Sequence, residues 1–178
     1  MRSSRGFTLI ELLLVMGIVA VLLAIAVTMY RSARVRGGEA VAIAALEAIN
    51  QAQFAYSQTC GHQAFAPTLE ALGAPRPVTG SAYLSPDLTT GEVVVKSGYA
   101  FRMSGTLVTD GSQTCTGATP VSSYQATADP TAPGVTGSRF FGTNTDRAIF
   151  EDLETFTGRM PETGVPERGN EIQAVRAR

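Results

Sequence analysis

Hydrophobic residues gather near the N-terminus in one run that is much longer than any later one. From Phe7 to Tyr30 the only charged residue is Glu11, and 12–27 is apolar apart from Gly17. A helix needs about 20 such residues to cross the hydrocarbon core of a bilayer. The run therefore predicts a membrane-spanning helix. Because a carboxylate at mid-depth in a bilayer costs about 2.5–3.5 kcal/mol, Glu11 is a candidate functional residue that requires a partner.

The pattern behind this run is typical of an amphipathic helix. Strong helix formers predominate over 39–57, and Ile43, Leu46 and Phe54 fall on one face, which we expect to pack against a sheet. The pair Gly37–Gly38 is the weakest point and a candidate bend, since each glycine costs about 1 kcal/mol in a helix interior.

Short segments with β-branched or alternating side chains follow, separated by turn residues. A short helix is expected at Leu69–Leu72, and candidate strands lie at 92–96, 99–103, 122–128, 138–141 and 147–150. We expect an antiparallel meander of about four strands. The predicted fold class is α+β, with a long N-terminal α-helix packed against a small antiparallel β-sheet. Glycine, proline and alternating charges over 157–178 predict a flexible tail.

Length and composition agree with this division. A chain of 178 residues can form one anchor helix and one small domain, and 16% charged residues is low for a soluble protein. The formal net charge of −1 gives no overall basic signal for nucleic acid, and no specific nucleic-acid partner is expected.

The segment Gly6-Phe7-Thr8-Leu9-Ile10-Glu11-Leu12, together with the apolar run, resembles the N-terminal signature of type IV prepilins and type II secretion pseudopilins. The resemblance implies that a prepilin peptidase cleaves after Gly6 and methylates the new terminus at Phe7. It also implies that Glu11 meets the N-terminal charge of a neighbouring subunit during assembly. The parts expected on this basis are a leader at 1–6, a membrane and filament-core helix at 7–30, an amphipathic helix at 31–58, a β-rich pilin domain at 59–156 and the tail at 157–178.

A second resemblance covers Gly37 to Gln53 and then Cys60-Gly61. The pattern Gly-x-Glu-Ala…Ala-Ile-Asn-x-Ala-Gln is similar to one subgroup of pilin-like proteins from soil and sediment bacteria. Thr28 stands where many members of the superfamily have a proline, so a helix kink that depends on that proline is not expected here.

Two other interpretations of the apolar run remain open. It resembles an ordinary membrane anchor, and it also fits a secretory signal peptide cut after Ala26 in the small-x-small sequence Ala24-Ile25-Ala26. Arginines flank the run on both sides, so their distribution does not fix its orientation.

The two cysteines, Cys60 and Cys115, form no CxxC motif. In a domain exported from the cytoplasm they predict one disulfide, and two free buried thiols are the alternative. His62 is the only histidine and is expected in a surface loop, so no catalytic set and no metal site is predicted. Asp110 and Asp146 are interpreted as turn formers, with a calcium contact as the alternative.

The aromatic residues of the predicted strands, which are Tyr99, Phe101, Tyr124, Phe140 and Phe141, are expected in the core. The chain is therefore predicted to be a structural subunit of a type IV pilus-like filament, without a cofactor and without enzymatic activity. Its expected partners are further copies of itself, the prepilin peptidase and an inner-membrane assembly platform. The precursor would span the inner membrane once, with its domain in the periplasm, before joining an extracellular pilus. The alternatives are a periplasmic pseudopilin of type II secretion and a monomeric membrane-anchored binding module.

Overall fold

The structure is a computed structural model that describes residues 7–76 and 79–172. The helices are α1 (Leu9–Thr59), η1 (Glu70–Gly73) and η2 (Pro86–Leu88), and the strands are β1 (Val93–Lys96), β2 (Tyr99–Leu107), β3 (Val121–Pro130), β4 (Phe140–Asn144), β5 (Ile149–Asp152) and β6 (Asn170–Glu171). The chain divides into two compact units, residues 1–34 and 35–178, which are described separately.

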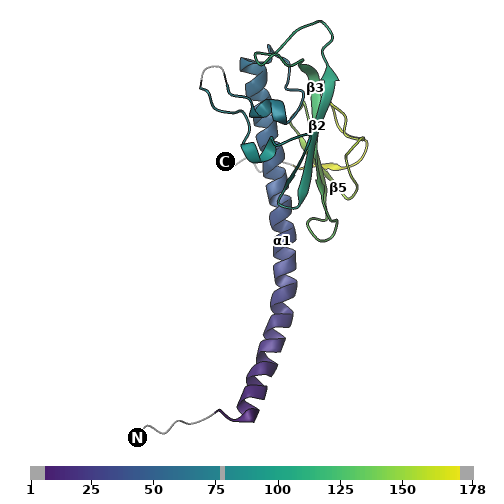
Figure 1. The fold of residues 1–178 in the computed structure, drawn as a ribbon. Helices are drawn as coiled ribbons and strands as arrows, with labels where there is room; N and C mark the ends of the chain where they lie inside the picture. Colours follow the sequence, from purple (N-terminus) through teal and green to yellow (C-terminus); the bar gives the residue numbers. More distant parts are fainter. Residues whose placement is uncertain (1–6, 77–78, 173–178) are drawn as a thin grey trace, which may run out of the picture. The chain divides into compact units, whose positions relative to one another are not determined.

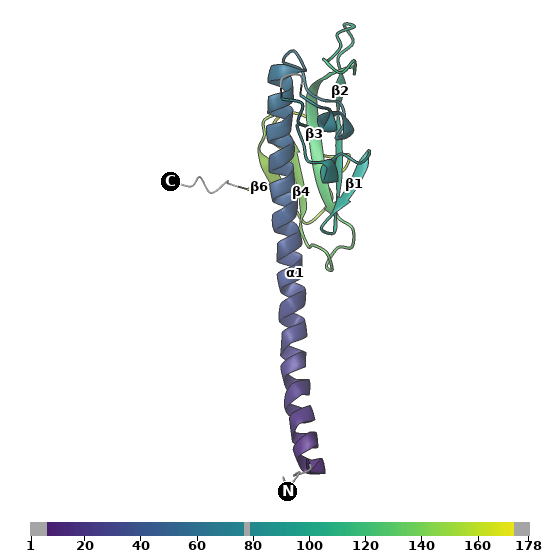
Figure 2. The ribbon, with the colours of Figure 1, turned by 60° about the vertical axis from the view of Figure 1, so that its left-hand side comes forward.

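In the second unit, the strands form one antiparallel sheet in the order of the chain, β1 to β6 (Figure 2). The hairpin between β1 and β2 turns at Ser97 and Gly98, which both have positive φ angles of 51° and 84°. Two such residues are typical of the type I′ turn that matches the twist of adjacent strands. The predicted meander is thus confirmed, with six strands instead of about four.

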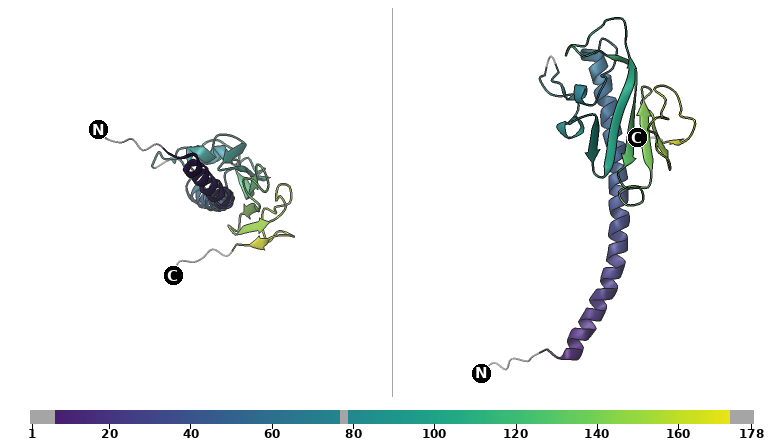
Figure 3. Two further views of the ribbon diagram at one scale, coloured as in Figure 1. Left: turned by 90° about the horizontal axis from the view of Figure 1, so that it is seen from below. Right: turned by 45° about the vertical axis from the view of Figure 1, so that its right-hand side comes forward.

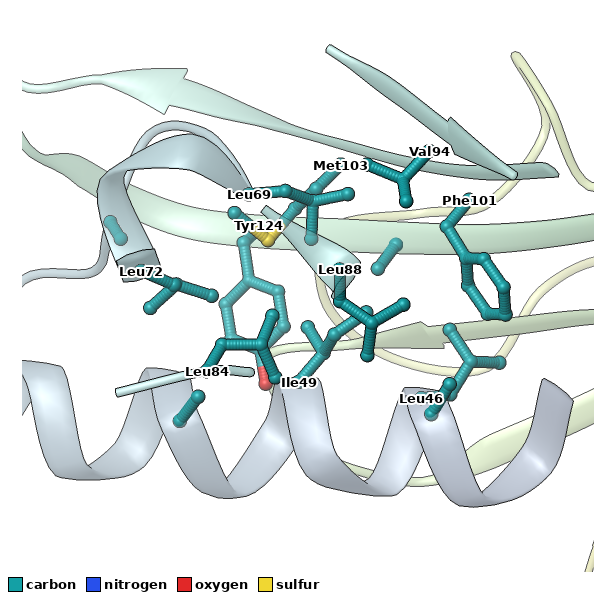
Figure 4. Packing of buried hydrophobic residues seen from close by; sticks show 14 of the residues in the cluster. Leu46, Ile49, Leu69, Leu72, Leu84, Leu88, Val94, Phe101, Met103 and Tyr124 are labelled. Carbon is teal, nitrogen blue, oxygen red and sulfur yellow. The ribbon is translucent and has the colours of Figure 1, made fainter. Parts of the chain in front are cut away.

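The second half of α1 covers one face of this sheet (Figure 1). Fully buried side chains from α1, including Leu46 and Ile49, meet Phe101 of β2 and Tyr124 of β3. Leucines of the 69–88 segment fill the space between the helix and the strands (Figure 4). The structure therefore confirms the α+β class, in which a long apolar N-terminal helix packs against an antiparallel sheet.

The buried face of α1 differs from the predicted one. Leu46 is buried as expected and Ile43 is partly buried, but Phe54 is 49% exposed and its ring centroid lies 4.8 Å from the Arg147 guanidinium. Tyr56, which is fully buried, occupies the core instead. The helix also continues through Gly37–Gly38, where a bend was a candidate.

The expected flexible tail is wrong for the described residues 157–172. Asn170–Glu171 pair with β5 as strand β6, shown in yellow beside β5 in Figure 3. Met160 packs with Phe156 and Phe150 in a second apolar cluster. This cluster covers Gly142, at which an added Cβ would lie 2.9 Å from the Met160 sulfur. The predicted helix at 69–72 appears as the 3-10 turn η1, shifted by one residue.

Candidate assembly segment

The first half of α1 exposes its side chains around the whole helix. Every residue from Phe7 to Tyr30 is exposed, and the most apolar stretch of α1 has a mean hydropathy of 2.9 with none of it buried. Among the described residues, this is the one helix whose length and composition allow it to cross a membrane. A helix that is apolar on all sides needs lipid or other apolar helices around it.

Thr8 caps the beginning of this helix. Its hydroxyl oxygen accepts a hydrogen bond from the Glu11 amide at 3.3 Å, and its carbonyl oxygen accepts one from the Leu12 amide at 3.2 Å. Glu11 lies in the first helical turn, and the exposed Phe7 precedes the helix. Gly6, where cleavage is predicted, lies outside the described residues. The structure thus presents a carboxylate in an apolar surface, close to the predicted mature terminus.

An ion pair between the buried Glu39 carboxylate and Arg139 fixes the second half of α1 to the strand region. The side chain of Glu39 is 5% exposed, and its Oε2 accepts hydrogen bonds from Arg139 Nε at 3.0 Å and Nη2 at 2.7 Å. Its Oε1 accepts hydrogen bonds from the Ser138 amide at 3.0 Å and hydroxyl at 2.8 Å. Burial raises the pKa of Glu39, but these hydrogen bonds outweigh it and hold the pKa below its ordinary value. Arg139 also pairs with Glu151.

Asn50 is buried at the centre of the interface between helix and sheet. Its amide nitrogen donates to the Thr143 hydroxyl at 2.9 Å, and its amide oxygen accepts from the Tyr124 hydroxyl at 3.0 Å. Burial raises the pKa of Tyr124 far above its usual range, so the phenol remains a neutral donor.

One turn further on, Gln53 forms a pair of hydrogen bonds with the backbone of Ala66. The Gln53 Nε2 donates to the Ala66 carbonyl at 2.9 Å, and its Oε1 accepts from the Ala66 amide at 2.8 Å. Glu39, Asn50 and Gln53 are the polar members of the Gly-x-Glu-Ala…Ala-Ile-Asn-x-Ala-Gln pattern. Each is buried and bonded to the globular unit, so this pattern specifies how α1 docks.

Residues 1–27 match the family model described as the prokaryotic N-terminal methylation motif. This motif is the type IV pilin and pseudopilin prepilin signature. The chain carries the prepilin signature. No curated protein matches the chain. The motif implies processing by a prepilin peptidase and pilus assembly, and with the apolar helix it fits anchoring of the precursor in the inner membrane. The type IV pilin family is a structural one.

The predicted pairing of the cysteines is present. Cys60 and Cys115 form a disulfide that joins the residue after α1 to the loop between β2 and β3. The Cys115 amide also donates to the Cys60 carbonyl at 3.0 Å. The bond therefore closes the C-terminal end of the helix onto the sheet.

The remaining candidate residues lie in turns of the globular unit. Asp110 accepts a hydrogen bond from the Ser112 amide at 2.8 Å, and Asp146 accepts one from the Gly164 amide at 2.6 Å. His62 is exposed in the loop after α1. Over residues 7–76 and 79–172, no three His, Cys, Asp or Glu side chains gather at metal-binding distance.

The docking contacts are the feature that sequence reasoning missed. In the sequence, Glu39 and Asn50 stand out only as members of the Gly-x-Glu-Ala…Ala-Ile-Asn-x-Ala-Gln pattern. Their partners Arg139 and Thr143 are 100 and 93 residues away along the chain, so no local spacing relates them. A polar residue within an otherwise apolar helical face was the available signal.

Proposed function

We propose that this protein is a structural subunit of a type IV pilus-like filament. The observation that carries the proposal is the first half of α1, an apolar stretch that is exposed on every side, overlaps the matched prepilin motif and contains the single carboxylate Glu11. Such a helix is stored in the inner membrane and later enters a bundle of identical helices. There, apolar side chains of neighbouring subunits replace the lipid.

The proposed processing divides the chain as follows. The leader 1–6 is removed after Gly6, Phe7 becomes the N-methylated terminus, and residues 7–30 form the filament core. Residues 31–58 carry the globular domain, which forms the outside of the filament. The prepilin peptidase and an inner-membrane assembly platform are the proposed partners.

Glu11 is proposed to pair with the Phe7 ammonium of the next subunit. Two opposite charges offset each other's loss of hydration inside an apolar bundle, whereas either alone is strongly unfavourable. Because the pairing partner is another copy, the pair also sets the register between subunits.

A pseudopilin of a type II secretion system is the second candidate, because the signature is common to both classes. Its short filament would remain in the periplasm and act in protein export. The abundance of filaments outside the cell distinguishes the two candidates.

The test is mass spectrometry of the mature protein from its native host, combined with electron microscopy of sheared surface material. We expect an N-methylated Phe7 terminus, and we expect Gly6→Val to leave the full precursor, since glycine lets the peptidase approach the backbone closely. A mature terminus after Ala26 would identify a secretory signal peptide and refute the proposal.

A further inference from the structure

Strand β1 forms one free edge of the sheet. The strand order places β2 on one side of it and no strand on the other, and Figure 2 shows β1 at the rim of the sheet. The opposite edge is the two-residue strand β6, so β1 is the longer of the two edges. A free strand edge presents backbone groups that can pair with a strand of another molecule.

The backbone groups of two β1 residues, Val93 and Val95, point away from the sheet. The two-residue turn at Ser97–Gly98 makes Lys96 and Tyr99 a hydrogen-bonded pair, and such pairs alternate with non-bonded ones along an antiparallel ladder. The amide and carbonyl groups of Val93 and Val95, which belong to the non-bonded pairs, therefore face the free edge. Among the described residues, none forms a backbone hydrogen bond with either valine from outside the ladder.

The side chains along this edge are apolar and exposed. Val93 and Val95 are 47% and 62% exposed, whereas Val94 between them is 2% exposed and packs into the core. β-Branched side chains fit well against one another on the surface of a sheet. An added strand of the same kind would therefore cover this apolar surface as well as the outward-facing backbone groups.

The charges at the two ends of β1 have opposite sign. Glu92 directly precedes the strand and is exposed. Lys96 ends the strand and pairs with Asp87 at 2.6 Å, in side chains that are 33% and 51% exposed. A lysine on an edge strand commonly blocks pairing with other molecules. Here an antiparallel strand of the same sequence would bring a glutamate to each lysine, so these charges favour pairing between copies.

We propose that the β1 edges of two copies of this chain pair with each other in an antiparallel register. In the register that uses both outward-facing valines, Val93 lies opposite Val95 of the second copy, and Glu92 lies opposite its Lys96. Each contact occurs twice because the pairing has twofold symmetry. Opposed residues have Cα atoms about 4.5–5.5 Å apart, within reach of the glutamate and lysine side chains. A parallel, in-register pairing would instead place equal charges opposite each other, which is unfavourable.

The pairing joins copies that run in opposite directions. A twofold axis perpendicular to the sheet reverses the direction of the second half of α1, which lies on the sheet, so the two copies are not neighbours within one filament. One short strand buries far less than the roughly 800 Å² per partner of a stable interface. Rows of β1 edges on two filaments would add many such weak contacts. On the proposed function, the partner is therefore a subunit of a second filament.

Cross-linking with a carbodiimide tests the pairing, because this reagent joins a carboxylate to an amine only where the two are in contact. Lys96 is the only lysine of the chain. The full chain in detergent is prepared as a mixture of unlabelled and isotopically labelled protein, so mass spectrometry distinguishes links between copies from links within one. We expect Lys96 to be linked to Glu92 of another copy, with a yield that rises with protein concentration.

Charge variants make the test specific. Glu92→Arg and Lys96→Glu should each weaken the association measured by sedimentation equilibrium about tenfold. An equal mixture of the two variants should restore the association, because opposite charges then meet at both ends of the pairing. The matched control is Lys96→Arg, which keeps the charge and the association but removes the amine that is cross-linked. Near-UV circular dichroism verifies that each variant folds.

Links from Lys96 to Asp87 of the same copy alone would overturn the proposal. Links between copies that favour other exposed carboxylates, such as Glu47 and Glu70, would overturn it as well, and so would a mixture of charge variants that associates no better than either variant.

Electron microscopy of sheared filaments tests the contact between filaments. Parent filaments should lie side by side, and Glu92→Arg filaments should be single. Parent filaments that remain single would overturn the lateral contact and leave the filament proposal intact. Absence of filaments would contradict the filament proposal, whereas the cross-linking result would still decide whether the β1 edges pair.

Discussion

Replacement of Glu39 by glutamine tests whether the ion pair with Arg139 fixes the second half of α1 to the sheet. The variant keeps the shape of the side chain and an oxygen that can accept the hydrogen bonds from the Ser138 amide and hydroxyl. It loses two charge-assisted hydrogen bonds from Arg139, at 3.0 and 2.7 Å. Hydrogen bonds to charged groups contribute about 1.5–3 kcal/mol.

Solvent reduces this contribution because the Arg139 side chain is 40% exposed and also contacts Glu151. We therefore expect Glu39→Gln to lower the free energy of unfolding by about 2 kcal/mol. In a domain of this size that loss lowers the melting temperature by about 4–8 °C.

The destabilisation caused by Glu39→Gln should become smaller as the pH falls. The folded-state pKa of Glu39 lies below the ordinary value of 4.5, so its stabilising contribution is complete above that pH. It is lost as the pH falls through the folded-state pKa. The difference between the parent chain and Glu39→Gln should therefore shrink in acid below about pH 4.5.

The assay is urea unfolding of the full chain in detergent micelles. Near-UV circular dichroism follows the buried tyrosines Tyr56, Tyr99 and Tyr124. The matched control is Glu47→Gln, since this carboxylate is exposed on the same helix. If the free energies of unfolding of the two variants agree within about 0.5 kcal/mol at neutral pH, the ion pair does not stabilise the docking of α1. The prediction would then be wrong.

Four further predictions concern the second half of α1 and its attachment to the sheet. Gly37→Ala should stabilise by about 0.5–1 kcal/mol because its Cβ meets nothing within 4 Å. Gly38→Ala should destabilise by about 1–3 kcal/mol, because its Cβ would lie 2.8 Å from a carbonyl oxygen; equal unfolding midpoints would contradict this contrast. Asn50→Leu should cost about 1–3 kcal/mol by leaving the buried Tyr124 hydroxyl without its hydrogen-bond acceptor, and unchanged urea unfolding would contradict it. Loss of the disulfide in a Cys60→Ser and Cys115→Ser double variant should lower the free energy of unfolding by about 4 kcal/mol. Alkylation of two thiols in the denatured, non-reduced parent chain would show that the disulfide is absent.

The sequence predicted those elements that local patterns determine. The apolar run of α1 leaves no alternative to a helix in an apolar environment. A hairpin around Ser97–Gly98 is determined by the β-branched segment before this turn and the alternating segment after it. The disulfide was predictable because the domain has two cysteines and is expected to be exported from the cytoplasm.

Elements that depend on distant contacts were not predictable in this way. Strand β6 is two polar residues, Asn170–Glu171, and nothing in them favours a strand without β5 beside them. The burial of Met160 depends on Gly142, whose missing side chain makes room for it. Phe54 was assigned to the core by periodicity, although the Arg147 guanidinium lies over its ring and leaves it half exposed.

In the proposed filament, α1 assembles with other copies through Glu11. The most direct test is the yield of sheared filaments from cells in which Glu11→Gln is the only copy, with the N-terminus of the variant verified by mass spectrometry. Removal of the carboxylate leaves the neighbouring Phe7 ammonium buried without a partner, a loss of about 3–5 kcal/mol at each contact. We predict a subunit that is cleaved and inserted in the membrane but enters filaments poorly. A filament yield equal to that of the parent chain would contradict the account and favour a monomeric membrane anchor.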